Sequence, residues 1–265
     1  MQNKVKILVV GDIIGKGARN AFIRYIPILK EKYKYDILAV NAENTTHGRG
    51  LNYKHYKAYN NANVDVLTMG NHALDNQEIF DYIDKTNNLV VPGNVKYEND
   101  VFNNHKEVTI DFNGYKIKFI NLLSASASKD KFSVIDPMEY FDLVYKDDKT
   151  IYIIDYHAEF TLEKNFLAYY VDGKASLIYG THTHVQTADE RILPNKTAYI
   201  TDVGMCGSLD SVIGYDYKSY LLKRQNNKGS TAVSTITPLM INALLVEIDL
   251  DTKEAFSVLR INQTM

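Results

Sequence analysis

The residues of this sequence that could do chemistry come in short polar groups, each placed just after an apolar run. Together the groups hold two carboxylates, two side-chain amides and four imidazoles: Asp12, Glu43, Asn44, Asn71, His72, His157, His182 and His184. Carboxylate and amide oxygens combined with imidazole nitrogens suit Mn, Fe or Zn, and no thiolate belongs to the set. The pattern therefore predicts a metal site.

The size of this set indicates more than one ion. Eight candidate ligands exceed the four that a single tetrahedral zinc ion takes. They fit two ions about 3.5–4 Å apart, joined by a carboxylate and by a water-derived hydroxide that attacks the substrate. A carboxylate is the natural bridge because it has two oxygens, and only Asp12 or Glu43 can provide it.

Each residue alone also has a simpler interpretation. Asp12 could cap a helix, and the Glu43-Asn44 and Asn71-His72 pairs could be turn residues. His157 alone would be interpreted as a satisfied buried histidine. The joint occurrence of five such groups favours the metal site. Three other histidines, in a predicted loop, helix and hairpin, are interpreted as solvated or incidental: His47, His55 and His105.

The elements that position these groups alternate between strands and helices. Apolar runs predict strands at 4–10, 36–41, 64–69, 150–156 and 176–180. Helical spacing predicts helices at 17–33, 52–62, 74–85, 136–145 and 159–169. Pro27 should kink or interrupt the first helix, and Asp75 or Asn76 should cap the third. Residues 106–123 predict a hairpin around an Asn-Gly turn.

The tail adds predicted strands at 191–201, 241–248 and 255–261, and the polar stretch 225–236 is interpreted as a mobile loop. The alternation indicates βαβ units. We expect an α/β fold, a two-sheet sandwich flanked by helices, forming a single domain over residues 1–265. Because ligands bind outside the carboxyl ends of strands in such sheets, the five polar groups should converge on one site.

Composition limits the partners. The formal net charge is −2 and the pI about 6.4, so no broad basic field is available for a nucleic-acid backbone. We find no interleaving of aromatic and basic residues that would mark an extended nucleic-acid track. Apolar residues within 205–240 should be core or a surface for self-association, which would give a homo-oligomer: Val212, Ile213, Leu221 and Leu222.

Cysteine content and the N-terminus indicate a compartment. Cys206 is the one cysteine, so no internal disulfide can form, which suits a reducing cytosol. The N-terminal apolar run is short and has no small-residue cleavage site, so we expect no signal peptide. No apolar run approaches ~20 residues, so no membrane span is expected. These features predict a cytoplasmic protein.

Longer motifs carry a family resemblance. GDIIGKGAR, VNAEN, GNHALDNQEI, DYHAE and GTHTHVQTADERILPNKTAYITDVGMCG resemble the calcineurin-like metallophosphoesterases, and most closely the YmdB family of bacterial phosphodiesterases. The resemblance implies the metallophosphoesterase-type sandwich, hydrolysis of 2′,3′-cyclic nucleotides and two divalent metal ions. Iron is the metal it favours, with manganese or zinc as alternatives.

The resemblance also implies a ligand assignment. One ion would take Asp12, Glu43, Asn44 and His184, and the other Glu43, Asn71, His157 and His182, which makes Glu43 the bridge. The chain departs from the wider superfamily at Ile14, where a histidine is usual. It departs from the YmdB family at Ser124-Ala125-Ser126, where a Gly-Arg pair is usual. If that arginine binds substrate in other members of the family, Arg49 or Lys16 would replace it in this chain.

His72 is not needed as a ligand if Asn71 binds metal. It would then face the leaving group as a proton donor or charge stabiliser. Asp75 could orient it, but the sequence favours Asp75 as a helix cap. The few cations near the site favour a small-molecule phosphodiester or nucleotide over a monoester. Two alternatives stay open: a metal-dependent nuclease or phosphomonoesterase, and a metal-bound regulatory module that senses a nucleotide. A proton donor beside Asn71 favours catalysis.

Overall fold

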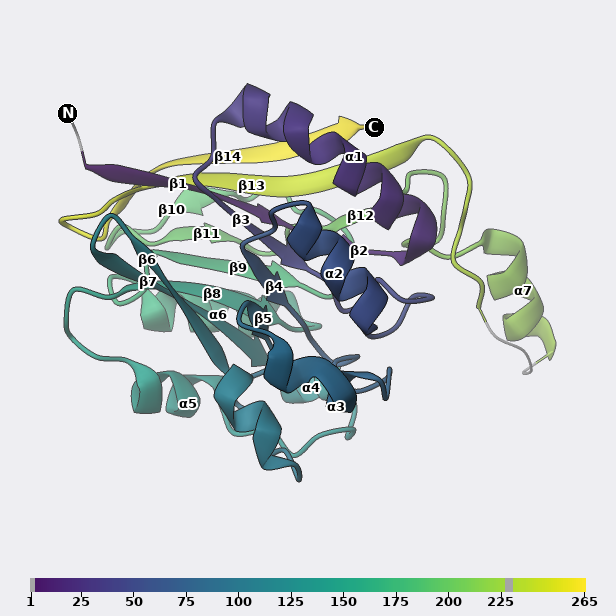
Figure 1. Ribbon diagram of the computed structural model, residues 1–265, viewed down its shortest axis with the longest axis horizontal. Coiled ribbons are helices and arrows are strands. Elements are labelled where there is room, and N and C mark those ends of the chain that lie inside the picture. The colour runs from purple at the N-terminus through teal and green to yellow at the C-terminus, as the bar shows by residue number, and fades with distance from the viewer. Residues whose placement is uncertain (1–2, 227–230) are drawn as a thin grey trace.

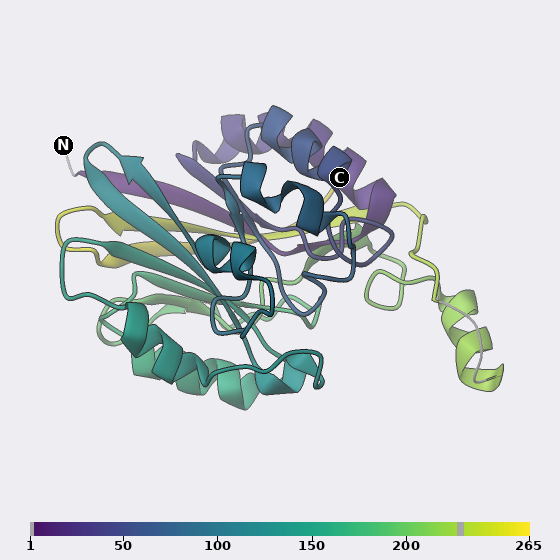
Figure 2. The same cartoon turned by 60° about the horizontal axis from the view of Figure 1, so that its bottom comes forward.

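The computed structural model describes residues 3–226 and 231–265, and two β-sheets packed face to face form its centre (Figures 1 and 2). The eight-stranded sheet has the order β2-β12-β13-β1-β3-β4-β5, and β14 pairs with β13. The six-stranded sheet has the order β10-β11-β9-β8-β7-β6.

The strands of the larger sheet are β1 (Lys4–Val10), β2 (Asp12–Ile13), β3 (Ile37–Asn41), β4 (Val66–Thr68), β5 (Leu89–Val90), β12 (Met205–Ser208), β13 (Leu239–Asp249) and β14 (Ala255–Thr264). Those of the smaller sheet are β6 (Glu107–Phe112), β7 (Tyr115–Leu123), β8 (Ile151–His157), β9 (Leu177–Thr181), β10 (Arg191–Ile192) and β11 (Ala198–Ile200). Strands β1, β3, β4 and β5 run parallel, as do β7, β8, β9 and β11. Parallel pairing places the carboxyl ends of each set at one edge.

The helices cover the outer faces of the two sheets. They are α1 (Gly15–Tyr33), α2 (Tyr53–Asn61), α3 (Ile79–Tyr82), α4 (Ala125–Ser128), α5 (Pro137–Val144), α6 (Thr161–Val171) and α7 (Tyr217–Asn226), with 3₁₀ helices η1 (Ile83–Lys85) and η2 (Asp100–His105). Helix α7 is the exception, because it stands out from the body of the molecule in both views. Within the described ranges, no helix is long and apolar enough to cross a bilayer.

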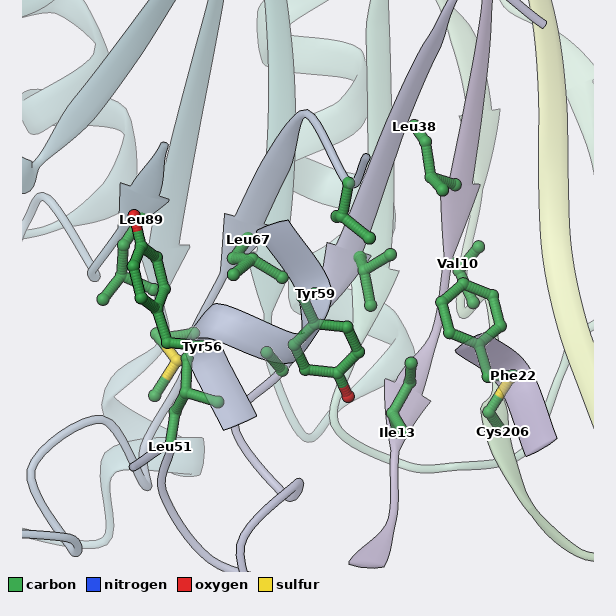
Figure 3. Packing of buried hydrophobic residues seen from close by; sticks show 14 of the residues in the cluster. Val10, Ile13, Phe22, Leu38, Leu51, Tyr56, Tyr59, Leu67, Leu89 and Cys206 are labelled. Atoms are coloured by element: carbon green, nitrogen blue, oxygen red, sulfur yellow. The ribbon is translucent and has the colours of Figure 1, made fainter. Parts of the chain in front are cut away.

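Three apolar clusters hold the layers together. The middle cluster lies between the sheets and includes Val9 of β1, Phe119 of β7 and Ile153 of β8. A second cluster packs α1 and α2 against the larger sheet, with Phe22 and Tyr59 fully buried (Figure 3). A third packs α5 and α6 against the smaller sheet. Successive residues of a strand therefore pack into different clusters on its two faces. Because both faces are buried, the predicted strands were almost wholly apolar.

The sandwich flanked by helices is confirmed, as are most of the predicted elements. The Asn-Gly hairpin is also confirmed, with positive φ at Asn113 and Gly114. Of the kink or interruption predicted at Pro27, the interruption is wrong, because α1 continues through it to Tyr33, and the kink stays a prediction. Pro27 lies on the exposed side of α1, where water can satisfy the carbonyl that loses its partner.

Three further predictions need correction. The helix expected over 74–85 is limited to α3 and η1, and neither Asp75 nor Asn76 caps it, because the N-cap position is Glu78. The Asp75 carboxylate binds His72 and Lys131 instead. The strand expected over 191–201 is a hairpin of β10 and β11, with Pro194 in its turn. The loop expected over 225–236 begins within α7; residues 227–230 lie outside the described ranges, and Val233 bridges to Tyr215.

Candidate metal centre

The five polar groups predicted from the sequence meet at the carboxyl ends of strands from both sheets. Asp12 follows β1, Glu43 and Asn44 follow β3, and Asn71 follows β4, all in the larger sheet. His157 ends β8, and His182 and His184 follow β9, in the smaller sheet. The edge where the two sheets approach each other therefore collects the carboxylate, amide and imidazole groups.

The first half of the site surrounds Asp12. Asn44 Nδ2 lies 3.1 Å from Asp12 Oδ1, 3.1 Å from Glu43 Oε1 and 3.2 Å from His184 Nε2. His184 Nε2 lies 3.6 Å from Asp12 Oδ1, and all of these side chains are buried. Asn44 thus touches every other member of the first predicted ligand set. Its amide would have to turn to present Oδ1 to a cation.

The second half surrounds His157. Its Nε2 atom lies 3.1 Å from Glu43 Oε1, 3.1 Å from Asn71 Oδ1 and 3.0 Å from His182 Nδ1. Glu43, His157 and His182 offer ligand atoms that all lie within 4.8 Å of one another. Gly70 permits this approach, since a Cβ there would lie 2.4 Å from Glu43 Oε2. Glu43 Oε1 thus lies 3.1 Å from a ligand side chain in each half, whereas among the described residues Asp12 reaches the second half only through the His182 backbone N–H.

Hydrogen bonds behind His157 fix its tautomer. Its Nδ1 atom lies 2.9 Å from Thr181 Oγ1, and that hydroxyl donates to Asp155 Oδ1 at 2.6 Å. The Thr181 oxygen must therefore accept the Nδ1 proton, so Nε2 is the ring nitrogen that faces Glu43, Asn71 and His182. Such outer hydrogen bonds orient metal-binding histidines. Sequence reasoning missed Thr181 and Asp155, although both lie within quoted motifs.

The HTH residues adopt a turn and not the alternating geometry of a strand. β9 ends at Thr181, and both His182 (φ 99°) and His184 (φ 65°) have positive φ. Residues without glycine's freedom adopt this conformation only when surrounding contacts impose it. The intervening Thr183 supplies those contacts, because its N–H and hydroxyl both donate to Asp202 Oδ2 at 3.2 and 2.8 Å.

A buried ion pair anchors the same turn. Lys164 Nζ lies 2.6 Å from Asp202 Oδ2 and donates to the Thr181 carbonyl at 2.9 Å. Both side chains of the pair are 1% exposed. On the outer sides of the histidines, His184 Nδ1 donates to the Ile213 carbonyl at 2.9 Å, and His182 Nε2 lies 2.9 Å from Glu159 Oε2. Both rings are thereby held with one nitrogen facing inward.

The charge balance of the site fits bound cations. Asp12 and Glu43 are 0% and 1% exposed, and among the described residues no lysine or arginine pairs with either. Burial opposes their ionisation, but His184 and His157 respectively keep the pKa of each carboxyl below its ordinary value. Burial also opposes protonation of His184, yet Asp12 raises its pKa to about 9. Buried charges need such compensation, and divalent ions would supply it.

Burial shifts the pKa values of two neighbouring groups, His182 and Asp155, in opposite directions. Burial and the nearby His157 lower the pKa of His182 to about 4, which keeps its Nδ1 lone pair available. Burial raises the pKa of Asp155 to about 6, against the donated hydrogen bonds of Thr181 and Thr68. The site therefore holds neutral and charged imidazoles side by side.

His72 lies at the rim of this cluster. Its backbone N–H donates to Glu43 Oε2 at 3.0 Å, and its Nδ1 atom lies 2.7 Å from Asp75 Oδ2. Lys131 Nζ donates to Asp75 Oδ1 at 3.0 Å and to the Asn71 carbonyl at 3.2 Å. Burial opposes ionisation of Asp75, but these bonds from His72 and Lys131 lower its pKa. Nε2 of His72 is left as the nitrogen that can transfer a proton.

The two predicted substrate cations differ in position. Arg49 lines a cavity of about 610 Å³, the Arg49 cavity, together with His47, Ile213, Tyr215, Tyr220 and Lys223. Lys16 is exposed in the first turn of α1, and it is not among the described residues that line the Arg49 cavity. The hydroxyls of Ser124 and Ser126, where the family has Gly-Arg, bond each other at 2.8 Å, and Lys131 Nζ of the same segment lies 3.3 Å from His72 Nδ1.

The three remaining histidines differ in exposure. His47 is exposed, as predicted, but it lines the Arg49 cavity. His55 is half-buried in α2, and burial with nearby Arg19 lowers its pKa to about 4. Of the solvated or incidental role predicted for His105 in the hairpin, the solvated alternative is wrong, because His105 is 7% exposed at the end of η2, before the hairpin and beside Thr86.

Comparison with known proteins identifies the family of this chain. The sequence pattern of the YmdB-like protein family matches residues 8–261. This chain belongs to that family. The YmdB-like chain is 39% identical over 262 residues to a Bacillus subtilis protein named 2′,3′-cyclic-nucleotide 2′-phosphodiesterase, covering 97% of this chain and 96% of that one.

Solved structures agree with this placement. A crystal structure described as a novel phosphatase from Mycoplasma pneumoniae has a TM-score of 0.92 and 37% identity, covering all of this chain and 95% of that one. The NAD nucleotidase of Haemophilus influenzae shares the fold alone, with a TM-score of 0.61 and 12% identity, covering all of this chain and 57% of that one. The YmdB-like chain therefore has the fold of this class of phosphatases.

Proposed function

We propose that this YmdB-like chain is a metal-dependent phosphodiesterase that hydrolyses 2′,3′-cyclic nucleotides. The observation that carries the proposal is the meeting of both halves of the site at Glu43, whose Oε1 lies 3.1 Å from both Asn44 Nδ2 and His157 Nε2. The activity printed for the Bacillus subtilis relative supports the same substrate class. Glu43 would be the shared ligand of two divalent ions.

The ligand sets follow the two halves of the site. One ion would be held by Asp12, Glu43, Asn44 and His184, and the other by Glu43, Asn71, His157 and His182. Oxygen and imidazole donors without thiolate suit iron, and also manganese or zinc. When bound, such ions lower the pKa of water and balance negative charge on phosphate. Nε2 of His157 and Nδ1 of His182, held inward by Thr181 and Glu159, are the nitrogens that would bind the ions.

The chain's own residues would complete the reaction. His72 holds its Nδ1 proton against Asp75, so Nε2 is the atom that would donate a proton to the departing ribose oxygen. Arg49 would contact a phosphate oxygen from the adjoining cavity. The oxygen of one water would bond to phosphorus as one ester bond of the cyclic phosphate breaks, and a monoester would remain on the ribose.

One assay tests the proposal. The chain is purified anaerobically and supplied with 2′,3′-cyclic AMP, before and after chelation and after return of Fe²⁺ or Mn²⁺. We expect hydrolysis that is lost on chelation and restored by the metal. Single-stranded RNA and a generic phosphomonoester are run in parallel. Faster turnover of either would favour a nuclease or monoesterase, and tight binding without turnover of any would favour a regulatory module.

A further inference from the structure

The Arg49 cavity adjoins the metal centre. Ile213, which lines the cavity, accepts the Nδ1 proton of His184 on its carbonyl at 2.9 Å. The cavity wall also includes Gly48, where a Cβ would lie 3.6 Å from Cε1 of Tyr215. Burial raises the pKa of the Tyr215 phenol; Arg49 opposes this and the charges of Glu43 and Asp12 add to it. A molecule in this cavity would therefore lie beside the proposed metal ligands.

The lining is suited to a nucleotide. Arg49 and Lys223 are cations, and the described lining residues include no acid. Within residues 3–226 and 231–265, no acid pairs with the Arg49 guanidinium, so no described carboxylate competes with an anionic ligand for it. Tyr215 and Tyr220 add two aromatic rings to the same cavity. Its volume of about 610 Å³ falls within the range of small-molecule pockets, roughly 300–1,000 Å³.

We propose that the Arg49 cavity is the nucleoside subsite, in which the substrate base stacks on Tyr220 while the phosphate faces Arg49 and the metal centre. This inference rests on the proposed function, because it takes the substrate to be a nucleotide. Stacking on an aromatic ring tolerates every base, since each base has a π-face. The chain should therefore accept all four 2′,3′-cyclic nucleotides, and should turn over a base-free analogue poorly.

The neighbouring Tyr217 provides a matched control. Tyr217 and Tyr220 both belong to α7, and their exposed fractions are 62% and 41%. Tyr220 lines the cavity, and Tyr217 is not among the described residues that line it. The experiment compares kcat/KM for 2′,3′-cyclic AMP with kcat/KM for the 2′,3′-cyclic phosphate of 1-O-methylribose, which has no base. Wild type, Tyr220→Ala, Tyr220→Phe and Tyr217→Ala are measured.

We expect Tyr220→Ala to reduce the preference for 2′,3′-cyclic AMP by at least about fivefold, the low end for loss of one stacked base. Tyr220→Phe should keep the preference, because the ring remains, and Tyr217→Ala should leave it unchanged. An unchanged preference in Tyr220→Ala, or an equal loss in Tyr217→Ala, would overturn the subsite. Thermal unfolding of each variant checks that α7 has not been lost.

A binding measurement separates this inference from the proposed function. Calorimetric titration with 2′-AMP, which requires no turnover, compares wild type with Tyr220→Ala. If neither cyclic phosphate is hydrolysed by wild type but 2′-AMP binding weakens at least about fivefold in Tyr220→Ala, the subsite stands and the proposed function fails. If hydrolysis proceeds and Tyr220→Ala alters neither preference nor binding, the proposed function stands and the subsite fails.

Discussion

His72 Nδ1 and Asp75 Oδ2 lie 2.7 Å apart, and this contact engages one ring nitrogen of His72 and leaves Nε2 as the other. The two residues are one helical turn apart in sequence, yet Asp75 lies before α3 and outside any helix. Lys131 holds Asp75 from the other side, at 3.0 Å from Oδ1. The imidazole is therefore fixed by a carboxylate that is itself fixed by a lysine.

Replacing His72 with asparagine should lower kcat for 2′,3′-cyclic AMP by ~10²–10⁴, the range for loss of a general acid. The metal content of the variant should stay near that of wild type, because the backbone N–H that binds Glu43 is retained. Steady-state kinetics and elemental analysis of the same sample check both statements. Full turnover in a metal-loaded variant would remove His72 from the reaction.

Arg49 and Lys16 should behave differently when each is replaced with methionine. Arg49→Met removes a cation from the cavity beside the metal centre, so KM for 2′,3′-cyclic AMP should rise by about tenfold, as for loss of one charge-assisted hydrogen bond. Lys16→Met should change KM by less than about twofold, because Lys16 is exposed on α1 and lies outside the cavity lining that the structure describes. The opposite order of effects would assign the substrate contact to Lys16.

The Lys164–Asp202 pair should matter for stability. Lys164→Met leaves Asp202 buried without its cation, which should cost about 3–5 kcal/mol of unfolding free energy. Lys174→Met is the matched control, because its pair with Asp142 is 38% and 50% exposed and should contribute about 0–1 kcal/mol. Chemical denaturation of the metal-free variants measures both values. Similar losses in the two variants would contradict the importance of burial for this pair.

The sequence predicted the parts of the site that depend on local pattern. A polar group after an apolar strand is visible without a structure, and Asp12, Asn71 and His157 were found in this way. The contacts that orient these groups join distant segments: Ile213 with His184, Lys131 with Asp75, and Lys164 with Asp202. No periodicity reports such approaches, because they arise only when the two sheets and their loops are packed.

The fold was predictable to a similar degree. Fully buried strands such as β1 and β8 have continuous apolar runs, which identify them readily. The β10–β11 hairpin was misjudged, although Pro194 within the run argued against one continuous strand. Helix α7 was missed because it packs little against the body and so has no wide apolar face. The single-domain interpretation and the homo-oligomer stay predictions.

The most direct test of the account is the number of metal ions per chain in wild type and in Glu43→Gln, counted by elemental analysis after anaerobic purification. Glu43→Gln keeps the shape of the side chain and removes the shared carboxylate, whereas Glu247→Gln alters a half-buried glutamate paired with Lys4 and Lys6 and serves as control. The account predicts about two ions in wild type and in the control, and loss from both positions in Glu43→Gln. Two ions retained in Glu43→Gln would contradict it.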